Sequence, residues 1–348
     1  MFGILRFVFA LMVVFGKFAG VEVIPGIGVW GFFILSGFLM TLVLNEKYTF
    51  GKNGLRRFFI SRILRLYPCY YAVMLLTMVL YVFLLGYDWN RIGESFFGTY
   101  RDITANLLIF GNTIFGIGRA DVIVPISWAV DVEMLMYIAS VIFIARSPKC
   151  ALYSLIATLV LFPVLWIVAK NYLASGETAL GSNLIYSFLP AALLPYSLGS
   201  AIYHYRKRFF LKYSPLRAFC LLFTLVCIGL FMPKYSVTLA FLSSLPVSSM
   251  MIIMLYRAER SEFDNVIGDL TYPVYLTVGT VNTVLHKTDF FNFPNLIAST
   301  KAYTSIGLAC ALLILLGIAY ALILCVDKPI QKYRKRFTAN QGILDKAG

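Results

Sequence analysis

The chain has 348 residues, of which 60% are hydrophobic and only 13% charged, and its mean hydropathy is +0.82. Soluble globular domains carry about 25% charged residues, so the composition excludes a soluble protein. Segments with alternating apolar and polar positions are absent, which excludes a transmembrane β-barrel.

Apolar segments of 17 or more residues, each long enough to cross a hydrocarbon layer about 30 Å thick, recur along the chain, and ten predicted spans indicate an all-α, polytopic membrane helix bundle. With the N-terminus in the cytosol, 21 of the 30 Lys and Arg residues fall in cytosolic segments, 7 in external segments and 2 inside the first span. This bias is the positive-inside signature. The net charge of +14 therefore indicates topology, with both termini cytosolic, and not a nucleic-acid partner. The predicted spans are residues 2–19, 27–45, 67–87, 124–145, 151–169, 184–203, 217–232, 236–256, 266–287 and 303–326.

No linker, low-complexity block or internal repeat divides the chain. We therefore expect one transmembrane domain over residues 1–327 and a short basic cytosolic tail at 328–348. The six cysteines form no CxxC pair, so neither a disulfide framework nor a metal site is indicated. The first span has only Arg6 as a basic flank and no A-x-A site after it, so we expect an uncleaved helix and not a signal peptide.

The first span carries two cations, Arg6 and Lys17, which are eleven positions apart. At 100° per residue this spacing is about 20° from three full turns, so both side chains project from one face, about 16 Å apart along the axis. Ionisable residues inside membrane helices mark functional sites by default. The alternative is that each side chain snorkels to its own interface.

The second span contains a polar notch, Ser36-Gly37, and a basic turn then leads into RRFFISRILRLYPCYY. In this segment Arg62 and Arg65 are three positions apart and share one helix face at the cytosolic boundary. Guanidinium groups bind phosphate oxygens bidentately, so the pair fits a pyrophosphate-bearing cytosolic donor. Anchoring by the topology rule is the alternative, and it accounts better for Arg56 and Arg57 than for this pair.

Two connections between spans are unusual. The external connection contains ITANLLIFGNTIF (103–115), which is apolar enough to dip into the bilayer or to cap a cavity. Gly111, Gly116 and Gly118 fit such a bend, although an ordinary surface loop is equally compatible. The cytosolic segment HYRKRFFLKYSPLR (204–217) interleaves bases with aromatics and either binds anionic lipid or a phosphorylated donor or lies at the interface without a ligand.

The fourth span carries Glu133 about two turns from its start, with Asp131 two residues earlier. Residues two apart do not share a helix face, so these are not a catalytic carboxylate pair. Glu133 shares its face with Tyr137. It either pairs with Arg6 or Lys17 to hold the helices together or orients a hydroxyl substrate.

Six segments follow one another in a characteristic order, and each alone is weak evidence. They are LRFVFALMVVF, FFILSGFLM, RFFISRILRLYP, ISWAVDVEMLMY, IGDLTYPVYL and VDKP. Together, from Arg6 to Pro329, they resemble the motifs of the acyltransferase 3 family of integral membrane acyltransferases. The resemblance implies an enzyme that uses cytosolic acyl-CoA, often acetyl-CoA, to acylate hydroxyls of glycans destined for the cell surface, without a metal.

The resemblance also implies roles for individual residues. Arg6 matches the arginine of the family's Arg-x10-His motif, Ser36 its Ser-Gly-Phe step, and Glu133 its fourth-span glutamate, while Arg62 and Arg65 match its arginine pair. The candidate catalytic residues are thus Arg6, Lys17 and Glu133. The candidate donor-binding residues are Arg62, Arg65 and Ser36.

Three positions depart from the family pattern. Lys17 stands where the family has its histidine, Trp30 where an aspartate is common, and Val278 where a histidine often occurs. Acyl transfer to a hydroxyl needs a base that is neutral near pH 7, and burial lowers the pKa of lysine by up to about 3–5 units. A desolvated Lys17 would then serve as a base or an oxyanion partner, not as an acyl carrier, because an acylated amine is a stable amide.

Two functions therefore fit the sequence. The first is a membrane O-acyltransferase of the cell membrane that acts on a surface polysaccharide or its lipid-linked precursor. The second is a catalytically silent relative that helps to translocate a glycan or lipid precursor, or supports a partner enzyme of glycan assembly. Membrane lipids are the other expected partners.

Overall fold

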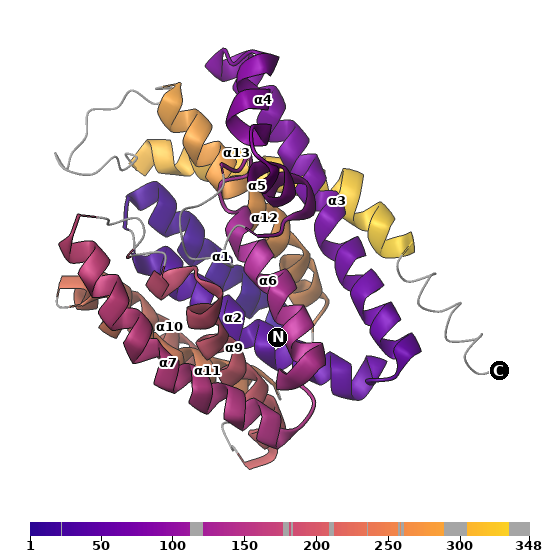
Figure 1. Cartoon of the computed structure of the whole chain (residues 1–348), viewed down its shortest axis with the longest axis vertical. Coiled ribbons are helices and arrows are strands. Elements are labelled where there is room, and N and C mark those ends of the chain that lie inside the picture. Colours follow the sequence, from indigo (N-terminus) through magenta and orange to yellow (C-terminus); the bar gives the residue numbers. More distant parts are fainter. Residues whose placement is uncertain are drawn as a thin grey trace.

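The computed structural model describes residues 1–21, 23–111, 121–176, 181, 184–208, 212–234, 236–256, 258, 261–288 and 305–333. Every regular element in these residues is helical, and no strand occurs among them (Figure 1). The predicted all-α membrane bundle is confirmed. The main helices are α1 (Phe2–Ala19), α2 (Val23–Val43), α3 (Lys52–Leu85), α4 (Trp89–Phe97), α5 (Tyr100–Ile103), α6 (Ser127–Ala139), α7 (Pro148–Ala174), α9 (Leu189–Tyr205), α10 (Pro215–Phe231), α11 (Val237–Tyr256), α12 (Glu262–Lys287) and α13 (Ser305–Leu322). Short turns of π-helix extend several of them: η1 (Leu44–Tyr48), η2 (Thr104–Leu108), η3 (Ser140–Ile144) and η6 (Ile323–Asp327).

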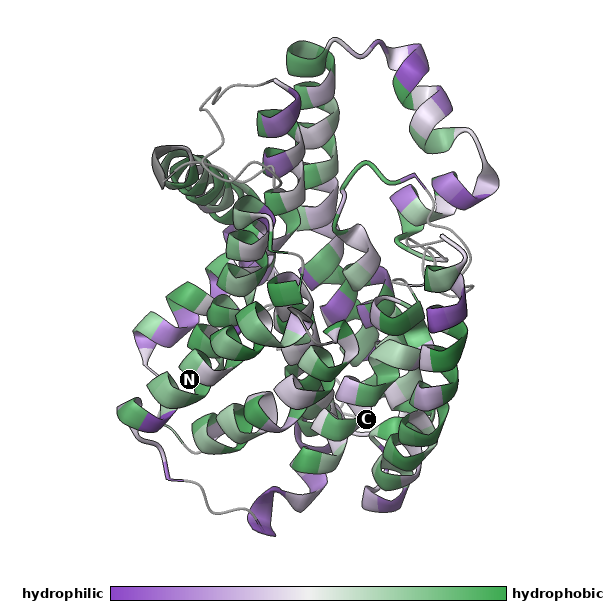
Figure 2. Cartoon of the chain, turned by 90° about the vertical axis from the view of Figure 1, so that its left-hand side faces the viewer, coloured by the Kyte–Doolittle hydropathy of each residue, from purple (hydrophilic) through white to green (hydrophobic). Residues whose placement is uncertain are grey.

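Each of the ten predicted spans overlaps one of these helices, although the ends differ; residues 124–126 and 187–188, for example, lie in predicted spans and are not helical. By length and composition, eight described helices are able to cross a membrane. The other two spans are α10, which is shorter, and α12, which is 26 residues long but carries Glu262, Asp264 and Asp269 near its start. Hydrophobic residues make up much of the helices (Figure 2), and large apolar side chains such as Phe83, 80% exposed, face outward. Lipid is the solvent that such a surface requires, so this is a multi-pass membrane protein.

The third span begins earlier than predicted. α3 runs without a break from Lys52 through Pro68 to Leu85, a total of 34 residues, which corresponds to about 51 Å. The arginine-rich part of the basic segment therefore belongs to this helix, in agreement with the prediction that Arg62 and Arg65 lie on a helix. As a result Arg56 is exposed, whereas Arg62 is buried among the other helices.

α2 is the central helix of the bundle and packs against α1, α6, α9, α10 and α11. It crosses α9 where two glycines meet. A Cβ atom on Gly37 would overlap the carbonyl oxygen of Tyr196, and one on Gly199 would overlap the carbonyl oxygen of Ile34. Near the crossing, Thr41 Oγ1 donates a 2.8 Å hydrogen bond to Ser200 Oγ. Gly37 thus permits α2 and α9 to pack closely. Its neighbour Ser36 is not part of this glycine contact.

The external connection folds back onto α3. Tyr67, Tyr70 and Tyr71 donate hydrogen bonds of 2.6–2.8 Å to the carbonyls of Leu108, Asn106 and Leu107. Asn106 is fully buried and bonds to four backbone groups, the carbonyls of Phe96, Asp102 and Asp121 and the amide of Ile123.

The predicted alternatives for segment 103–115 are a dip into the bilayer, a cap over a cavity and a surface loop; its described part, residues 103–111, packs against α3. Gly111 has a φ of +90° and so supplies one predicted bend. Gly116 and Gly118 lie outside the described residues.

Candidate functional site

Four of the six predicted site residues line one cavity inside the bundle. They are Arg6 of α1, Ser36 of α2, Arg65 of α3 and Glu133 of α6. The cavity has a volume of about 90 Å³, several times the minimum that one water molecule needs. Its remaining walls are Val29, Phe32, Phe33, Leu35, Met40, Leu66, Ala129, Val130, Thr271, Tyr272 and Tyr275. Residues separated by up to 127 positions in the chain are thereby brought together, and the sequence alone does not supply this information.

Glu133 is held from two sides. Tyr137, one turn further along α6, donates a short hydrogen bond to Glu133 Oε1, as their shared helix face predicts. Ser36 Oγ donates to the same oxygen over 3.3 Å. Both donors fix the direction of the carboxylate, and its other oxygen receives no hydrogen bond from the described residues. The carboxylate is therefore oriented and keeps acceptor capacity for a ligand.

Three arginines surround this carboxylate without neutralising it directly. Arg6 lies within electrostatic range of Arg65, Glu133 and Arg62. Within the described chain, no ion pair of 4.0 Å or less joins Glu133 to any of these arginines. Three positive charges thus lie close to one negative charge; Arg62 is buried, and Arg6, Arg65 and Glu133 are half-buried. Such a region favours an anionic group or an oxygen on which negative charge develops.

Arg62 differs from the other two arginines. It is only 7% exposed and does not line the cavity. Its guanidinium lies over the rings of Phe58, at 5.6 Å, and Tyr137, at 6.0 Å, and its Nε has no hydrogen-bond partner among the described residues. Arg62 therefore contributes positive charge near the cavity without lining it. Of the two arginines of α3, Arg65 is the one that can contact a ligand in the cavity.

A second, polar cavity of about 300 Å³ adjoins the first. Arg6, Arg65 and Tyr272 line both cavities and so form the neck between them. The other walls of the polar cavity come mainly from the starts of α1 and α12 and from the end of the described chain: Phe2, Gly3, Leu39, Leu64, Asp264, Asn265, Gly268, Asp269, Asp327, Ile330 and Gln331. Asp264 of α12 holds the start of α1 in place, because its side chain accepts a 2.9 Å hydrogen bond from the amide of Ile4. In the predicted topology this cavity is on the cytosolic side.

Lys17 lies apart from these residues. It is in the last turn of α1, is exposed, and lines neither cavity. It is eleven positions from Arg6 along α1, which is about 16 Å along the axis. Among the sequence candidates it is the one that the structure does not bring near the cavity.

The other two departures from the family pattern are core positions. Trp30 is fully buried, with its ring stacked on Phe241 at 5.1 Å and edge-on to Phe162 at 5.8 Å. Val278 is also fully buried. Neither lines a cavity, so both substitutions replace polar residues by packing residues.

The sequence reasoning missed the contribution of α12. Thr271, Tyr272 and Tyr275 line the inner cavity, and Tyr272 donates a 2.9 Å hydrogen bond to the carbonyl of Leu66. Their spacing of three and four positions, which places them on one helix face, was the available signal. It was overlooked because the segment IGDLTYPVYL shows no ionisable residue beyond Asp269.

The comparisons with known proteins identify the family of the chain. The family model described as an acyltransferase domain matches residues 2–326, which includes every residue of the inner cavity. No curated protein and no solved structure gives a significant match. Since the family match covers nearly the whole chain, this multi-pass membrane protein belongs to the acyltransferase 3 family of acyltransferases.

Proposed function

We propose that the protein transfers an acyl group, foremost acetyl, from cytosolic acyl-CoA to a hydroxyl of a cell-surface polysaccharide or its lipid-linked precursor. The hydroxyl oxygen attacks the thioester carbonyl, a C–O bond forms and the C–S bond breaks. The hydroxyl proton passes through a base to the departing CoA thiolate, so the reaction balances without a further reactant.

One observation carries this proposal. Arg6, Ser36, Arg65 and Glu133 come from four helices and converge on one cavity, where each is half-buried. Charged groups are costly inside a membrane bundle and are retained where they bind or react. A purely structural role would pair the arginines with Glu133, and no such ion pair of 4.0 Å or less is present among the described residues.

The donor is assigned to the predicted cytosolic side. A thioester that enters through the polar cavity meets Arg6 and Arg65 at the neck before it reaches Ser36 and Glu133. Arg65 contacts the donor, Arg62 adds positive potential behind Tyr137, and Arg6 stabilises the negative charge that develops on the carbonyl oxygen. Ser36 orients Glu133.

Two residues are candidates for the base. Glu133 lies in the cavity, and its carboxylate accepts hydrogen bonds from Tyr137 and Ser36. Lys17, which replaces the family histidine, would act only on an acceptor that approaches the other end of α1. We place proton transfer at Glu133, because a lysine acts as a base near pH 7 only when it is desolvated and Lys17 is exposed.

The test measures acyl esters on surface glycans of cells that carry the full chain, with the Glu133→Gln, Lys17→Ala and Lys17→His variants. Glu94→Gln, on exposed α4, is the matched control. Loss of the ester in Glu133→Gln alone assigns the base to the cavity, and loss in Lys17→Ala with rescue in Lys17→His assigns it to the end of α1. An ester content that does not depend on the chain at all would reject the acyltransferase proposal and leave the silent, translocation-related role.

A further inference from the structure

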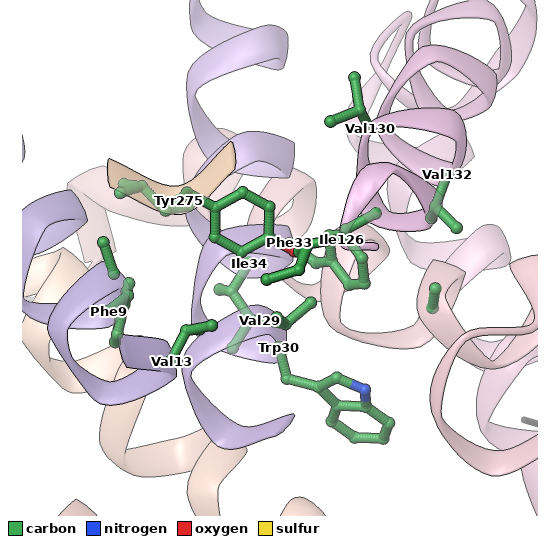
Figure 3. Close-up of a cluster of buried hydrophobic side chains, with 14 of the residues drawn as sticks. Phe9, Val13, Val29, Trp30, Phe33, Ile34, Ile126, Val130, Val132 and Tyr275 are labelled. Atoms are coloured by element: carbon green, nitrogen blue, oxygen red, sulfur yellow. The ribbon is translucent and has the colours of Figure 1, made fainter. Parts of the chain in front are cut away.

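The inner cavity has two chemically different ends. Its polar residues lie at the neck and around Glu133, whereas six side chains at the other end are apolar or aromatic: Val29, Phe32, Phe33, Ala129, Val130 and Tyr275. Five of these six are buried, with exposures of 2–7%, and Phe32 is half-buried. Several of them are drawn around α2 in Figure 3. We call these six residues the apolar end.

On α2, α6 and α12 the residues of the apolar end lie on the same side of Ser36 and Glu133. On α2, Phe32 and Phe33 precede Ser36 by one turn, and on α6 Ala129 and Val130 precede Glu133 by one turn. α12 runs in the opposite direction, so Tyr275 follows Thr271 by one turn. The rings of Phe32 and Tyr275 meet edge-on with centroids 5.8 Å apart. All three helices therefore put apolar side chains on the side of Ser36 and Glu133 that faces away from the neck.

The volume limits what fits there. A cavity of roughly 150 Å³ accommodates benzene, which has six carbons, so the 90 Å³ of the inner cavity has room for roughly three or four carbon atoms. Close-packed walls do not expand without cost. A thioester carbonyl placed near Ser36 and Glu133 would therefore leave room for a short alkyl tail only.

We propose that the apolar end is the pocket for the acyl tail of the donor, that it selects acyl groups of two to four carbons, and that Phe33 forms part of its wall. This inference rests on the proposed function, since it assumes that a thioester occupies the cavity. Phe33 is 3% exposed and lines the cavity, so its removal enlarges the pocket. Ala129, on the facing helix α6, is the position where added carbons shorten it.

The test is a titration of the purified full-length protein in lipid nanodiscs with CoA and with acetyl-, butyryl-, hexanoyl- and octanoyl-CoA, followed by calorimetry. Each buried methylene should raise affinity about fourfold up to butyryl, and affinity should fall by tenfold or more at hexanoyl. In Phe33→Ala this maximum should move to hexanoyl or octanoyl. In Ala129→Leu the butyryl affinity should fall at least tenfold while the affinity for CoA itself stays unchanged.

Phe38→Ala is the matched control, because Phe38 is a fully buried phenylalanine of the same helix that does not line the cavity. It should keep the wild-type chain-length profile whatever its effect on stability. Affinity that rises steadily through octanoyl-CoA in the wild type, or a profile that neither Phe33→Ala nor Ala129→Leu alters, would overturn the acyl pocket while leaving the acyltransferase proposal intact. Failure of every thioester to bind would overturn both.

Discussion

Removal of one hydroxyl, in the variant Tyr137→Phe, tests whether the orientation of Glu133 matters for activity. Tyr137 is 1% exposed and donates a hydrogen bond to Glu133 Oε1. The substitution deletes this donor but keeps the ring that packs against Phe58 at 5.9 Å and under Arg62. The bundle should therefore fold, and the perturbation should be confined to the carboxylate.

The expected magnitude follows from the bond that is lost. A hydrogen bond to a charged acceptor contributes about 1.5–3 kcal/mol, which corresponds to about a 10- to 150-fold change in rate. Because Ser36 continues to donate to the same oxygen over 3.3 Å, we expect the lower part of this range, in kcat and not in the KM for the donor. Ser36→Ala combined with Tyr137→Phe should be non-additive, since both hydroxyls act on one atom.

The assay is CoA release by membranes that contain the enzyme and its native glycan acceptor, normalised to the amount of folded protein. Tyr196→Phe is the matched control, because it deletes an equally buried hydroxyl whose 2.6 Å hydrogen bond goes to Ser140 outside the cavity. It should lower stability by about 0.5–1.5 kcal/mol and leave kcat unchanged. Equal kcat values for Tyr137→Phe, Tyr196→Phe and the wild type would refute the claim that a positioned Glu133 drives the reaction.

Three further predictions concern the scaffold. Gly37→Ala should sharply lower the yield of folded protein, because the added Cβ overlaps the Tyr196 carbonyl, whereas Gly317→Ala, which has open space, should not; detergent-solubilised yield and Tm measure both. Arg206→Ala should lower Tm more than Lys207→Ala. Arg206 donates hydrogen bonds to Glu46 over 2.8 Å, to the Tyr203 carbonyl and to the Tyr256 hydroxyl, whereas Lys207 is exposed. Equal Tm values for the two variants would contradict this. Asn106→Ala removes four hydrogen bonds from the connection between α3 and α6, so limited proteolysis should cut that connection faster than in the wild type. An unchanged cleavage rate would show that these hydrogen bonds do not hold the connection in place.

Much of the fold was accessible from hydropathy and charge. Apolar segments of sufficient length have few alternatives to a helix in lipid, and every predicted span overlaps a helix. The start of α3 was missed because the arginines at positions 56 to 65 suppress hydropathy without opposing helix formation. α12 is a second helix whose start has low hydropathy. Its first turns are acidic, although the helix packs against α1, α3 and α13.

The site was accessible only in part. Arg6, Ser36, Arg65 and Glu133 stand out as polar groups in apolar surroundings, and the structure brings all four to one cavity. The difference between Arg62 and Arg65 was not accessible, because both share a helix face and only the packing of Tyr137 and Phe58 separates the buried guanidinium from the cavity. Lys17 is a candidate because it is a second cation in the first span and stands where the family has its histidine. Its exposure depends on how α1 packs, which its spacing from Arg6 does not determine.

The most direct test of the central claim is a thiol-protection measurement on the variant Ser36→Cys. A small alkylating reagent is applied with and without saturating acetyl-CoA, and modification is read peptide by peptide by mass spectrometry. None of the six native cysteines lines the inner cavity, so they serve as internal controls. We expect acetyl-CoA to slow alkylation at position 36 at least tenfold and to leave the alkylation rate of exposed Cys220 unchanged. Equal alkylation of position 36 with and without the donor, in a protein that still transfers acyl groups, would contradict it.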